Sequence, residues 1–248
     1  TAVVLAAGKG TRMRSQTPKV LHRICGREMV GLVVDAATQA GLDAVVVVPQ
    51  GAQAVREALG DTVRYAKQPE PLGSGHALLQ TRSAMGGVDN VVVLAGDVPL
   101  IRPETLGRLI GLHDEREACV TLLTSTVAKP DGAGRVVRSP SGAIREIVEE
   151  SEADEATLAI SEINSGAYCF RASWLWDHLA DLAPSRTGEV YVTDLIVVAA
   201  QQGMVVESIQ AEDSEETLGV NTRVHLAEAV AVLRRRILEG WMTYGVTM

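Results

Sequence analysis

Four basic side chains surround two glycines near the start of the chain and could hold a polyphosphate. Gly8 and Gly10 stand two residues apart after the apolar run 3–7, and no acidic residue lies within residues 1–27. Glycine lets the backbone pass close to a ligand, and successive free N–H groups form an anion-binding concavity. The loop is therefore predicted to bind phosphate groups, the alternative being a surface turn with solvated cations. Its basic residues are Lys9, Arg12, Arg14 and Lys19.

Two better-known phosphate-binding motifs do not fit this loop. The P-loop pattern G-x-x-x-x-G-K-[ST] is not present with its required spacing. The dinucleotide-binding pattern G-x-G-x-x-G has Met13 where its third glycine should stand.

Composition sets bounds on the partners. The chain has 248 residues, of which 46% are hydrophobic and 22% charged, with a net charge of −8. That length suits either one large α/β domain or one domain with an appendage. A net negative surface disfavours nucleic acid and anionic membrane as partners. All 31 acidic residues lie beyond residue 27, so the N-terminal segment is positively charged while the rest of the chain is negatively charged. A local positive charge of this kind suits a small anionic substrate.

Three widely spaced cysteines form no zinc-binding or disulfide pattern. Cys25, Cys119 and Cys169 are odd in number and contain no C-x-x-C pair, so we expect reduced, mostly buried thiols. The first apolar run is too short for a signal peptide, and no stretch approaches the 18 or more apolar residues of a membrane span. These features predict a soluble, cytoplasmic protein without a membrane partner.

Strands alternate with helices in the first half of the chain. Apolar runs at 3–7, 44–48 and 91–95 predict buried strands, and a shorter one is expected at 62–65. Because the strands are apolar throughout, both faces of their sheet should be covered by helices. We therefore predict a Rossmann-like α/β fold with a doubly wound, mostly parallel (mixed) sheet. The helices are expected at 29–41, 53–59, about 74–85 and 103–115.

The second half is less regular and predicts a smaller insertion lobe at residues 126–190. A strongly acidic run occupies 149–155, and one long helix is expected from Thr222 to about Glu239. The predicted organisation is one domain over 1–225 with a C-terminal helix and linker arm over 226–248. Short strands are expected at 135–138, 143–148, 163–170 and 204–209, and helices near 173–182 and 192–202.

Two polar residues follow predicted strands or precede a predicted helix and could bind a ligand. Asp97 comes directly after the strand at 91–95 and a glycine, at the strand's carboxyl end, where α/β sheets bind ligands. Asp97 could instead begin a turn before Pro99. Asn221 precedes the long helix and could simply be its N-cap.

The loop contains Gly8-Lys9-Gly10-Thr11-Arg12-Met13, followed by Thr17-Pro18-Lys19-Val20-Leu21. This sequence resembles the signature loop of sugar-1-phosphate nucleotidyltransferases. Within that group it most resembles the bacterial N-acetylglucosamine-1-phosphate uridyltransferases, over residues 2 to about 230. The resemblance implies transfer of UMP from UTP to N-acetylglucosamine 1-phosphate, which yields pyrophosphate and UDP-N-acetylglucosamine, a peptidoglycan precursor. It implies direct in-line attack with no covalent enzyme intermediate.

The same resemblance implies the catalytic groups and a Mg²⁺ cofactor. Arg12 would face the triphosphate tail, and Lys19 would face the α-phosphate and the sugar phosphate. Gly96-Asp97-Val98-Pro99-Leu100 matches the family's metal-binding element, and Asn221 matches its second metal ligand. Hard oxygen ligands suit Mg²⁺, which takes one or two protein groups plus substrate phosphates. Further substrate-binding positions implied at the strand ends are Leu5, Ala6, Ala7, Gly8, Ala95 and Gly96.

Two further elements match the parts that bind base and sugar in the family. Gln68 with Leu72–Ala77 resembles the uracil-reading element, where Gly73 and Ser74 would touch substrate and Ser74 replaces the usual threonine. His76 in this element is expected to be structural rather than a catalytic base. Ala95 and Ser165 depart from the commoner family residues. The amino sugar would contact Gly134, Glu149 and Asn164.

Two motifs receive no functional role from the sequence. Thr193-Asp194 resembles part of a family Y-x-T-D element whose role does not follow from its residues. Arg234-Arg235-Arg236, near a helix end, is expected to complement the helix dipole and to meet solvent.

Other functions stay open at this stage. A nucleotidyltransferase of the same fold could use a different base or sugar, and a non-catalytic sugar-nucleotide sensor could keep the pocket. In the family a hexapeptide-repeat acetyltransferase domain commonly follows the long helix, so the chain could be a fragment of a bifunctional enzyme or a single-function protein. The sequence leaves the oligomeric state open.

Overall fold

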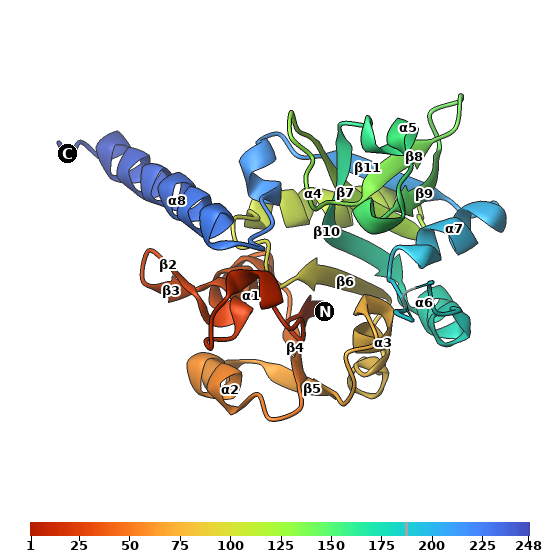
Figure 1. The fold of residues 1–248 in the computed structure, drawn as a ribbon, viewed down its shortest axis with the longest axis horizontal. Coiled ribbons are helices and arrows are strands. Elements are labelled where there is room, and N and C mark those ends of the chain that lie inside the picture. Colours follow the sequence, from red (N-terminus) through yellow and green to blue (C-terminus); the bar gives the residue numbers. More distant parts are fainter. Residues whose placement is uncertain (187) are drawn as a thin grey trace.

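A computed structural model describes residues 1–186 and 188–248 and shows a mixed sheet between two layers of helices (Figure 1). The main strands lie in the order β11-β7-β10-β6-β1-β4-β5. β1 pairs in parallel with β4 and β6, whereas β10 runs antiparallel between β6 and β7. The predicted mostly parallel, mixed sheet is confirmed. The strands are β1 Ala2–Leu5, β4 Ala44–Pro49, β5 Arg64–Gln68, β6 Asn90–Ala95, β7 Val120–Thr126, β10 Glu162–Arg171 and β11 Val206–Gln210.

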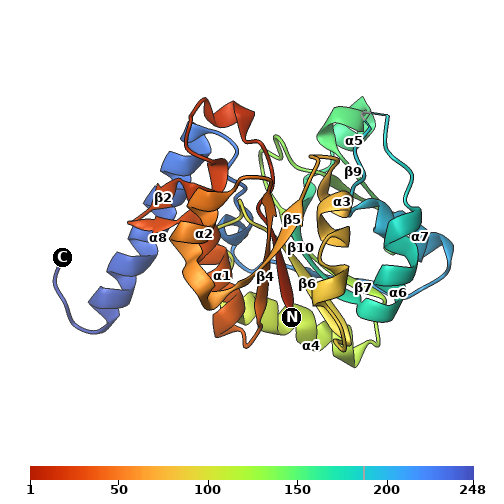
Figure 2. The ribbon, with the colours of Figure 1, turned by 90° about the horizontal axis from the view of Figure 1, so that it is seen from below.

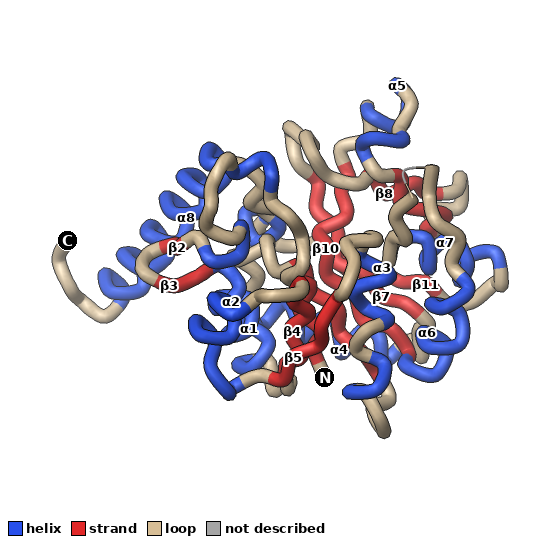
Figure 3. Tube along the Cα trace, turned by 60° about the horizontal axis from the view of Figure 1, so that its bottom comes forward, coloured by secondary structure: helices blue, strands red, loops and turns tan. Residues whose placement is uncertain are grey.

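Both faces of the sheet are covered, as the uninterrupted apolar strands require. Successive side chains of a strand point to opposite faces. Val3 therefore packs in one core with α3, α6 and α7, while Val4 packs in another with α1, α2 and α4. Figures 2 and 3 show helices on both sides of the central strands. The helices are α1 Met29–Gln39, α2 Gln53–Leu59, α3 Ser74–Leu79, α4 Pro103–Glu115, α6 Ala172–His178 and α7 Asp194–Gln201.

The insertion lobe is smaller than the predicted 126–190. It holds the hairpin of β8 (Arg135–Arg138) and β9 (Ile144–Val148) and the short helix α5 (Glu155–Leu158). β10 instead enters the central sheet, and α6 packs against it. The lobe is also continuous with the sheet, because Arg135 of β8 pairs with Ile163 of β10. Part of the irregular stretch thus builds the main core.

The long helix α8 (Arg223–Thr243) starts at the sheet and ends away from it. Its first turns bury Ala229 and Val232 against Leu100 and Val220, in a small core that also contains Ile24 of the hairpin β2 (Arg23–Ile24) and β3 (Arg27–Glu28). That hairpin was not predicted, because two-residue strands carry no periodicity. The last turns project from the body (Figures 1 and 2) and expose large apolar side chains. These are Ile237, Trp241, Met242 and Tyr244.

The expectation that Arg234–Arg236 lie near a helix end and complement its dipole was wrong. Arg234 and Arg235 are exposed to solvent as expected, whereas Arg236 is half-buried. Arg235 forms an ion pair with Glu215, and Arg236 donates to Asp213 at 3.0 Å and to the Leu100 carbonyl at 2.8 Å. The error arose because α8 continues to Thr243, beyond the predicted end at 239, so these arginines lie mid-helix beside an acidic turn.

Smaller differences have local causes. β5 begins at Arg64, after a 3-10 turn over Gly60–Thr62, and continues to Gln68 rather than ending at 65. α3 ends at Leu79 rather than near 85, where Thr81 donates its hydroxyl to the Leu78 carbonyl at 2.7 Å. Of the free cysteines, Cys119 and Cys169 are buried while Cys25 is exposed. Across the described residues, every helix is too short or too polar to cross a membrane.

Candidate active site

The loop from Gly8 to Lys19 folds back on itself beside the carboxyl end of β1. Gly10 has φ +60°, and a Cβ at this position would lie 2.5 Å from Lys19 Cβ. Only glycine adopts such a backbone at so close an approach without strain. Arg14 also has a positive φ of 47°, which turns the chain back toward the sheet. The glycine spacing therefore serves to bring Arg12 and Lys19 to one pocket.

Four of the predicted residues meet in a single hydrogen-bonded cluster. The Lys19 ammonium forms an ion pair with the Asp97 carboxylate and donates to Asn221 Oδ1 at 3.1 Å. The Arg12 guanidinium donates to the same Asn221 oxygen at 3.0 Å. The side chains of Lys19 and Asp97 are only 12% and 23% exposed. Segments about 80 and 200 residues distant from the loop are thus brought to it.

Backbone contacts hold the segments of this cluster together. Gly96 donates its N–H to the Leu5 carbonyl at 3.0 Å, and a Cβ on Gly96 would lie 2.8 Å from that oxygen. The ends of β1 and β6 can therefore approach only because residue 96 is glycine. Val220 donates its N–H to the Asp97 carbonyl at 2.8 Å, which places Asn221 beside Asp97.

Asn221 is not the N-cap of α8. That position belongs to Thr222, whose hydroxyl accepts from the His225 N–H at 3.2 Å. The Asn221 side chain faces Arg12 and Lys19 instead. The helix-capping alternative for Asn221 is therefore wrong, and the residue is left to serve the cluster.

Arg12, Asp97 and Asn221 of this cluster line two neighbouring hollows, while Lys19 lines only the first, which has a volume of about 620 Å³. Its far end is built by Gln68, whose amide nitrogen lies 3.0 Å from the Gly73 carbonyl and 3.1 Å from His76 Nδ1. The second contact supports the structural role expected for His76. We call this hollow the phosphate-side pocket, because Lys9, Arg12 and Lys19 line it.

Close contact with the backbone of residues 190–192 fixes the loop that follows Gln68. Gly73 has φ +97°, and a Cβ there would lie 2.4 Å from the Val190 carbonyl oxygen. Ser74 accepts a hydrogen bond from the Val192 N–H at 3.0 Å, so its hydroxyl holds residues 190–192 against the pocket. Ser74 stands where the family usually has threonine, and both residues carry a hydroxyl, so the substitution keeps this structural hydrogen bond.

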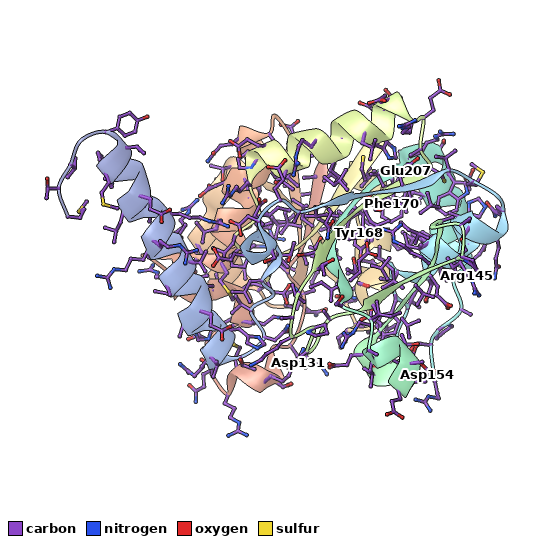
Figure 4. The ribbon with its side chains drawn as sticks, turned by 90° about the horizontal axis from the view of Figure 1, so that it is seen from above. Asp131, Arg145, Asp154, Tyr168, Phe170 and Glu207 are labelled. Atoms are coloured by element: carbon purple, nitrogen blue, oxygen red, sulfur yellow. The ribbon has the colours of Figure 1, made fainter. Side chains whose placement is uncertain are left out.

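The second hollow, of about 670 Å³, lies toward the lobe, and we call it the lobe-side pocket. Asn164 donates from Nδ2 to Tyr168 Oη at 2.6 Å and accepts from the Gly166 N–H at 3.2 Å. Its own N–H donates to the Gly134 carbonyl at 2.9 Å. Figure 4 shows Tyr168 in the interior on β10, whereas Asp131 lies at the periphery. Asn164 is therefore held from several sides.

Glu149 belongs to both pockets and carries the perturbed carboxylate of the site. Burial raises the pKa of Glu149, and the negative charges of Asp194, Glu152 and Glu189 raise it further. The Thr193 hydroxyl donates to Glu149 Oε1 at 3.2 Å and opposes that rise in pKa. Thr193 is buried, so the role that the sequence left undefined is to hold Glu149.

Most of the predicted substrate-binding residues line these two pockets. Ala6 and Gly96 are buried and line neither, so they support the wall through backbone contacts. Sequence reasoning missed Pro71, Glu189 and Tyr191, of which only Tyr191 carried a signal, as the first residue of the Y-x-T-D element. The predicted residues found on the walls are Leu5, Ala7, Gly8, Arg12, Lys19, Gln68, Gly73, Ser74, Ala95, Asp97, Gly134, Glu149, Asn164 and Asn221.

Comparison with known families decides what kind of protein carries this site. The model of the MobA-like NTP transferase domain matches residues 2–196, which is most of the chain. The chain belongs to this NTP transferase family. The matched residues include the loop from Gly8 to Lys19, Asp97 and the lobe-side residues, but end before Asn221.

Curated relatives extend the likeness to the full chain. The "Bifunctional protein GlmU" of Halalkalibacterium halodurans is 45% identical over 99% of this chain and 55% of that protein. The protein of the same name from Brevibacillus brevis is 46% identical over 100% of this chain and 54% of that protein. The chain thus spans about half the length of these relatives. The sequence resemblance to the uridyltransferase half of this family is confirmed.

Solved structures share the fold at low sequence identity. A UDP-glucose pyrophosphorylase complexed with UDP-glucose superposes with a TM-score of 0.77 at 16% identity, covering 95% of this chain and 98% of that one. A putative glucose-1-phosphate thymidylyltransferase from Bacillus anthracis gives the same TM-score at 21% identity, covering 94% and 95%. These likenesses concern the fold of the NTP transferase domain alone.

The donor set beside Lys19 fits a hard cation that is completed by substrate. Asp97 Oδ2 and Asn221 Oδ1 both accept from one nitrogen, Lys19 Nζ, so two oxygens converge on one cationic position. A carboxylate and an amide oxygen suit Mg²⁺, which commonly adds phosphate oxygens and waters. Within residues 1–186 and 188–248, no group of three His, Cys, Asp or Glu side chains could hold a metal on its own.

Proposed function

We propose that the chain catalyses Mg²⁺-dependent transfer of UMP from UTP to N-acetylglucosamine 1-phosphate. The observation that carries this proposal is the meeting of two pockets at Arg12, Asp97 and Asn221, all three of which line both. A nucleotide in one pocket and a sugar in the other would bring their phosphates together at the cationic loop. The family match and the full-length likeness to GlmU proteins support this assignment.

The reaction needs positioning more than it needs a base. The second pKa of a phosphate monoester is about 6, so the sugar phosphate is mostly a dianion at neutral pH. One of its oxygens forms a bond to the α-phosphorus of UTP, and the bond to the bridging oxygen of the β-phosphate breaks. UDP-N-acetylglucosamine and pyrophosphate result, with no proton to remove from the nucleophile.

The chain's own groups hold two anions in line. Arg12 binds the triphosphate tail, and Lys19 binds the α-phosphate and the attacking phosphate, where charge develops. Asp97 and Asn221 hold Mg²⁺, which when bound neutralises charge on the phosphate oxygens. Because two mutually repelling substrates are fixed side by side, most of the rate gain comes from orientation and electrostatics.

The geometry of Gln68 favours uracil over cytosine. Its amide nitrogen already contacts the Gly73 carbonyl and His76, which leaves the carbonyl oxygen as the group to meet a base. That oxygen accepts a hydrogen bond from N3–H of uracil, whereas N3 of cytosine is itself an acceptor. On the lobe side, Glu149 and Asn164 offer acceptors and donors to sugar hydroxyl and acetamido groups.

The test is pyrophosphate release from each of the four common NTPs with N-acetylglucosamine, glucose and galactosamine 1-phosphates. We expect UTP with N-acetylglucosamine 1-phosphate to give the highest kcat/KM. A higher value for another pair would replace the proposed substrates and keep the reaction. Binding of sugar nucleotides without turnover of any pair would favour a sensor and overturn the proposal.

A further inference from the structure

An ion-pair network joins α8 to the turn that precedes Asn221. Asp213 Oδ2 accepts from Arg102 at 2.6 Å and from Arg236 at 3.0 Å. Arg235 forms a second ion pair with Glu215 of the same turn. The turn over 213–216 is therefore clamped between the start of α4 and the middle of α8. The arginine side chains that clamp it come from segments more than 100 residues apart.

A buried carboxylate anchors the same turn on its inner side. Glu216 is 2% exposed. Its Oε2 accepts from the Thr105 hydroxyl at 2.6 Å and from the Arg102 N–H at 3.2 Å, and its Oε1 lies 3.6 Å from Arg102 Nε. A buried charge is tolerated only when it is paired and hydrogen-bonded, and breaking such a pair is strongly destabilising. The turn therefore has one fixed position on α4.

The anchored turn leads directly into the catalytic cluster. Val220, four residues after Glu216, is fully buried and donates its N–H to the Asp97 carbonyl at 2.8 Å. Arg236 also donates to the Leu100 carbonyl at 2.8 Å, three residues after Asp97. One guanidinium thus touches both segments that supply the oxygen ligands. Arg236 itself lines neither pocket.

We propose that Arg236 is a positioning residue that, through Asp213 and the Leu100 carbonyl, holds Asn221 beside Asp97. The docking of α8 is then coupled to the geometry of the active site. Loss of the guanidinium removes the bridge between Asp213 and the Leu100 carbonyl, so the segment that carries Asn221 is held less tightly to the segment that carries Asp97, and the two oxygens that face the cation separate. The catalytic part of this inference rests on the proposed function, while its structural part does not.

The structural part is tested by amide hydrogen exchange on the metal-free protein. Arg236→Met keeps an unbranched apolar stem and removes both contacts of the guanidinium. We expect exchange of the Val220 amide to accelerate about tenfold, while β4 amides keep their rates. Arg234→Met is the matched control, because Arg234 is exposed on the same helix, and it should change neither rate. An unchanged Val220 amide, or equal acceleration in β4, overturns the proposal.

The catalytic part is tested by a double-mutant cycle with Asn221→Ala. We expect Arg236→Met to raise the half-saturating Mg²⁺ concentration for pyrophosphate release about fivefold in the otherwise unchanged protein. In the Asn221→Ala background the same change should have no further effect, because Arg236 acts through Asn221. Equal effects in both backgrounds overturn the proposal. If the unchanged protein releases no pyrophosphate, the proposed function fails, and the exchange rates still decide the positioning role.

Discussion

The phosphate-side and lobe-side pockets share a wall but are built on different principles. On the phosphate side, one continuous loop supplies Arg12 and Lys19, and their charges are held by Asp97 and Asn221. On the lobe side, neutral hydrogen bonds from separate strands hold Asn164. The cationic groups of the loop are thus held by charge, whereas Asn164 is held by hydrogen bonds to neutral groups.

Effects of substitutions on catalysis and on folding stability should therefore be easier to separate on the phosphate side than on the lobe side. The charged groups of the phosphate side bond mainly to one another, so removing one of them disturbs catalysis more than folding. The lobe-side groups contact buried partners such as Tyr168 and Thr193, so substitutions there change binding and stability together.

The largest effect is expected for Asp97→Asn on the phosphate side. The change removes a full negative charge from the proposed Mg²⁺ site and from the Lys19 ion pair while it barely alters the shape of the side chain. We expect kcat to fall about 1,000-fold with almost no change in the melting temperature of the metal-free protein. Steady-state kinetics across Mg²⁺ concentrations check this, with Asp61→Asn as control, because Asp61 is exposed and lines neither pocket. Normal turnover of Asp97→Asn at limiting Mg²⁺ would remove Asp97 from the site.

Lys19→Ala should act on kcat more than on binding. If the ammonium meets charge that develops at the α-phosphate, kcat falls about 100-fold while the UTP dissociation constant changes less than about threefold. Kinetics and calorimetric titration with UTP separate the two quantities. A change in KM alone would reduce Lys19 to a tether for the ground state.

Glu149→Gln, on the lobe side, should change substrate binding and folding stability together, unlike the two substitutions on the phosphate side. Losing a charged acceptor should raise KM for the sugar phosphate about tenfold and change the UTP dissociation constant less than about threefold, although Glu149 lines both pockets. Because burial raises the pKa of Glu149 above its ordinary value of 4.5, its ionisation costs folding stability as the pH rises through that raised pKa. The Gln variant escapes this cost, so at pH 8 its melting temperature should be about 2 °C higher. Below pH 4 this advantage should disappear.

The smallest expected effects distinguish the roles of two adjacent residues, Asn221 and Thr222. Thr222→Ala removes the N-cap of α8 and should cost about 1 kcal/mol of unfolding free energy with little loss of activity. Asn221→Ala should lower activity about tenfold, less than Asp97→Asn because a neutral amide binds a dication more weakly, with nearly unchanged stability. Urea unfolding and pyrophosphate release on both variants check the pair. Equal stability losses would restore the capping role to Asn221.

The same contrast explains how far the sequence could be read. Apolar strands and the contiguous loop 8–19 are local patterns, so the parallel core, Arg12 and Lys19 were predictable. The antiparallel insertion of β10 was not, because its apolar residues read like any strand and its neighbours are chosen by tertiary packing. The ion pairs of Arg235 and Arg236 join distant segments, and no local sequence pattern predicts them.

The site residues themselves divide in the same way. Asp97 was predictable from its place after a buried strand, whereas Gly134, Glu149 and Asn164 followed only from resemblance. The role of Thr193 became visible only when α7 placed it against Glu149. Substrate contacts at these positions stay predictions, which the kinetics of Glu149→Gln test.

The central claim is that the site aligns two anions for one direct displacement, with no covalent intermediate on the protein. The most direct measurement is the stereochemical course at phosphorus, using UTP that carries one chiral α-thio substitution and N-acetylglucosamine 1-phosphate. A single in-line displacement inverts the configuration, and inversion is the predicted result. Retention would require two displacements and hence a uridylylated residue, and it would contradict the account.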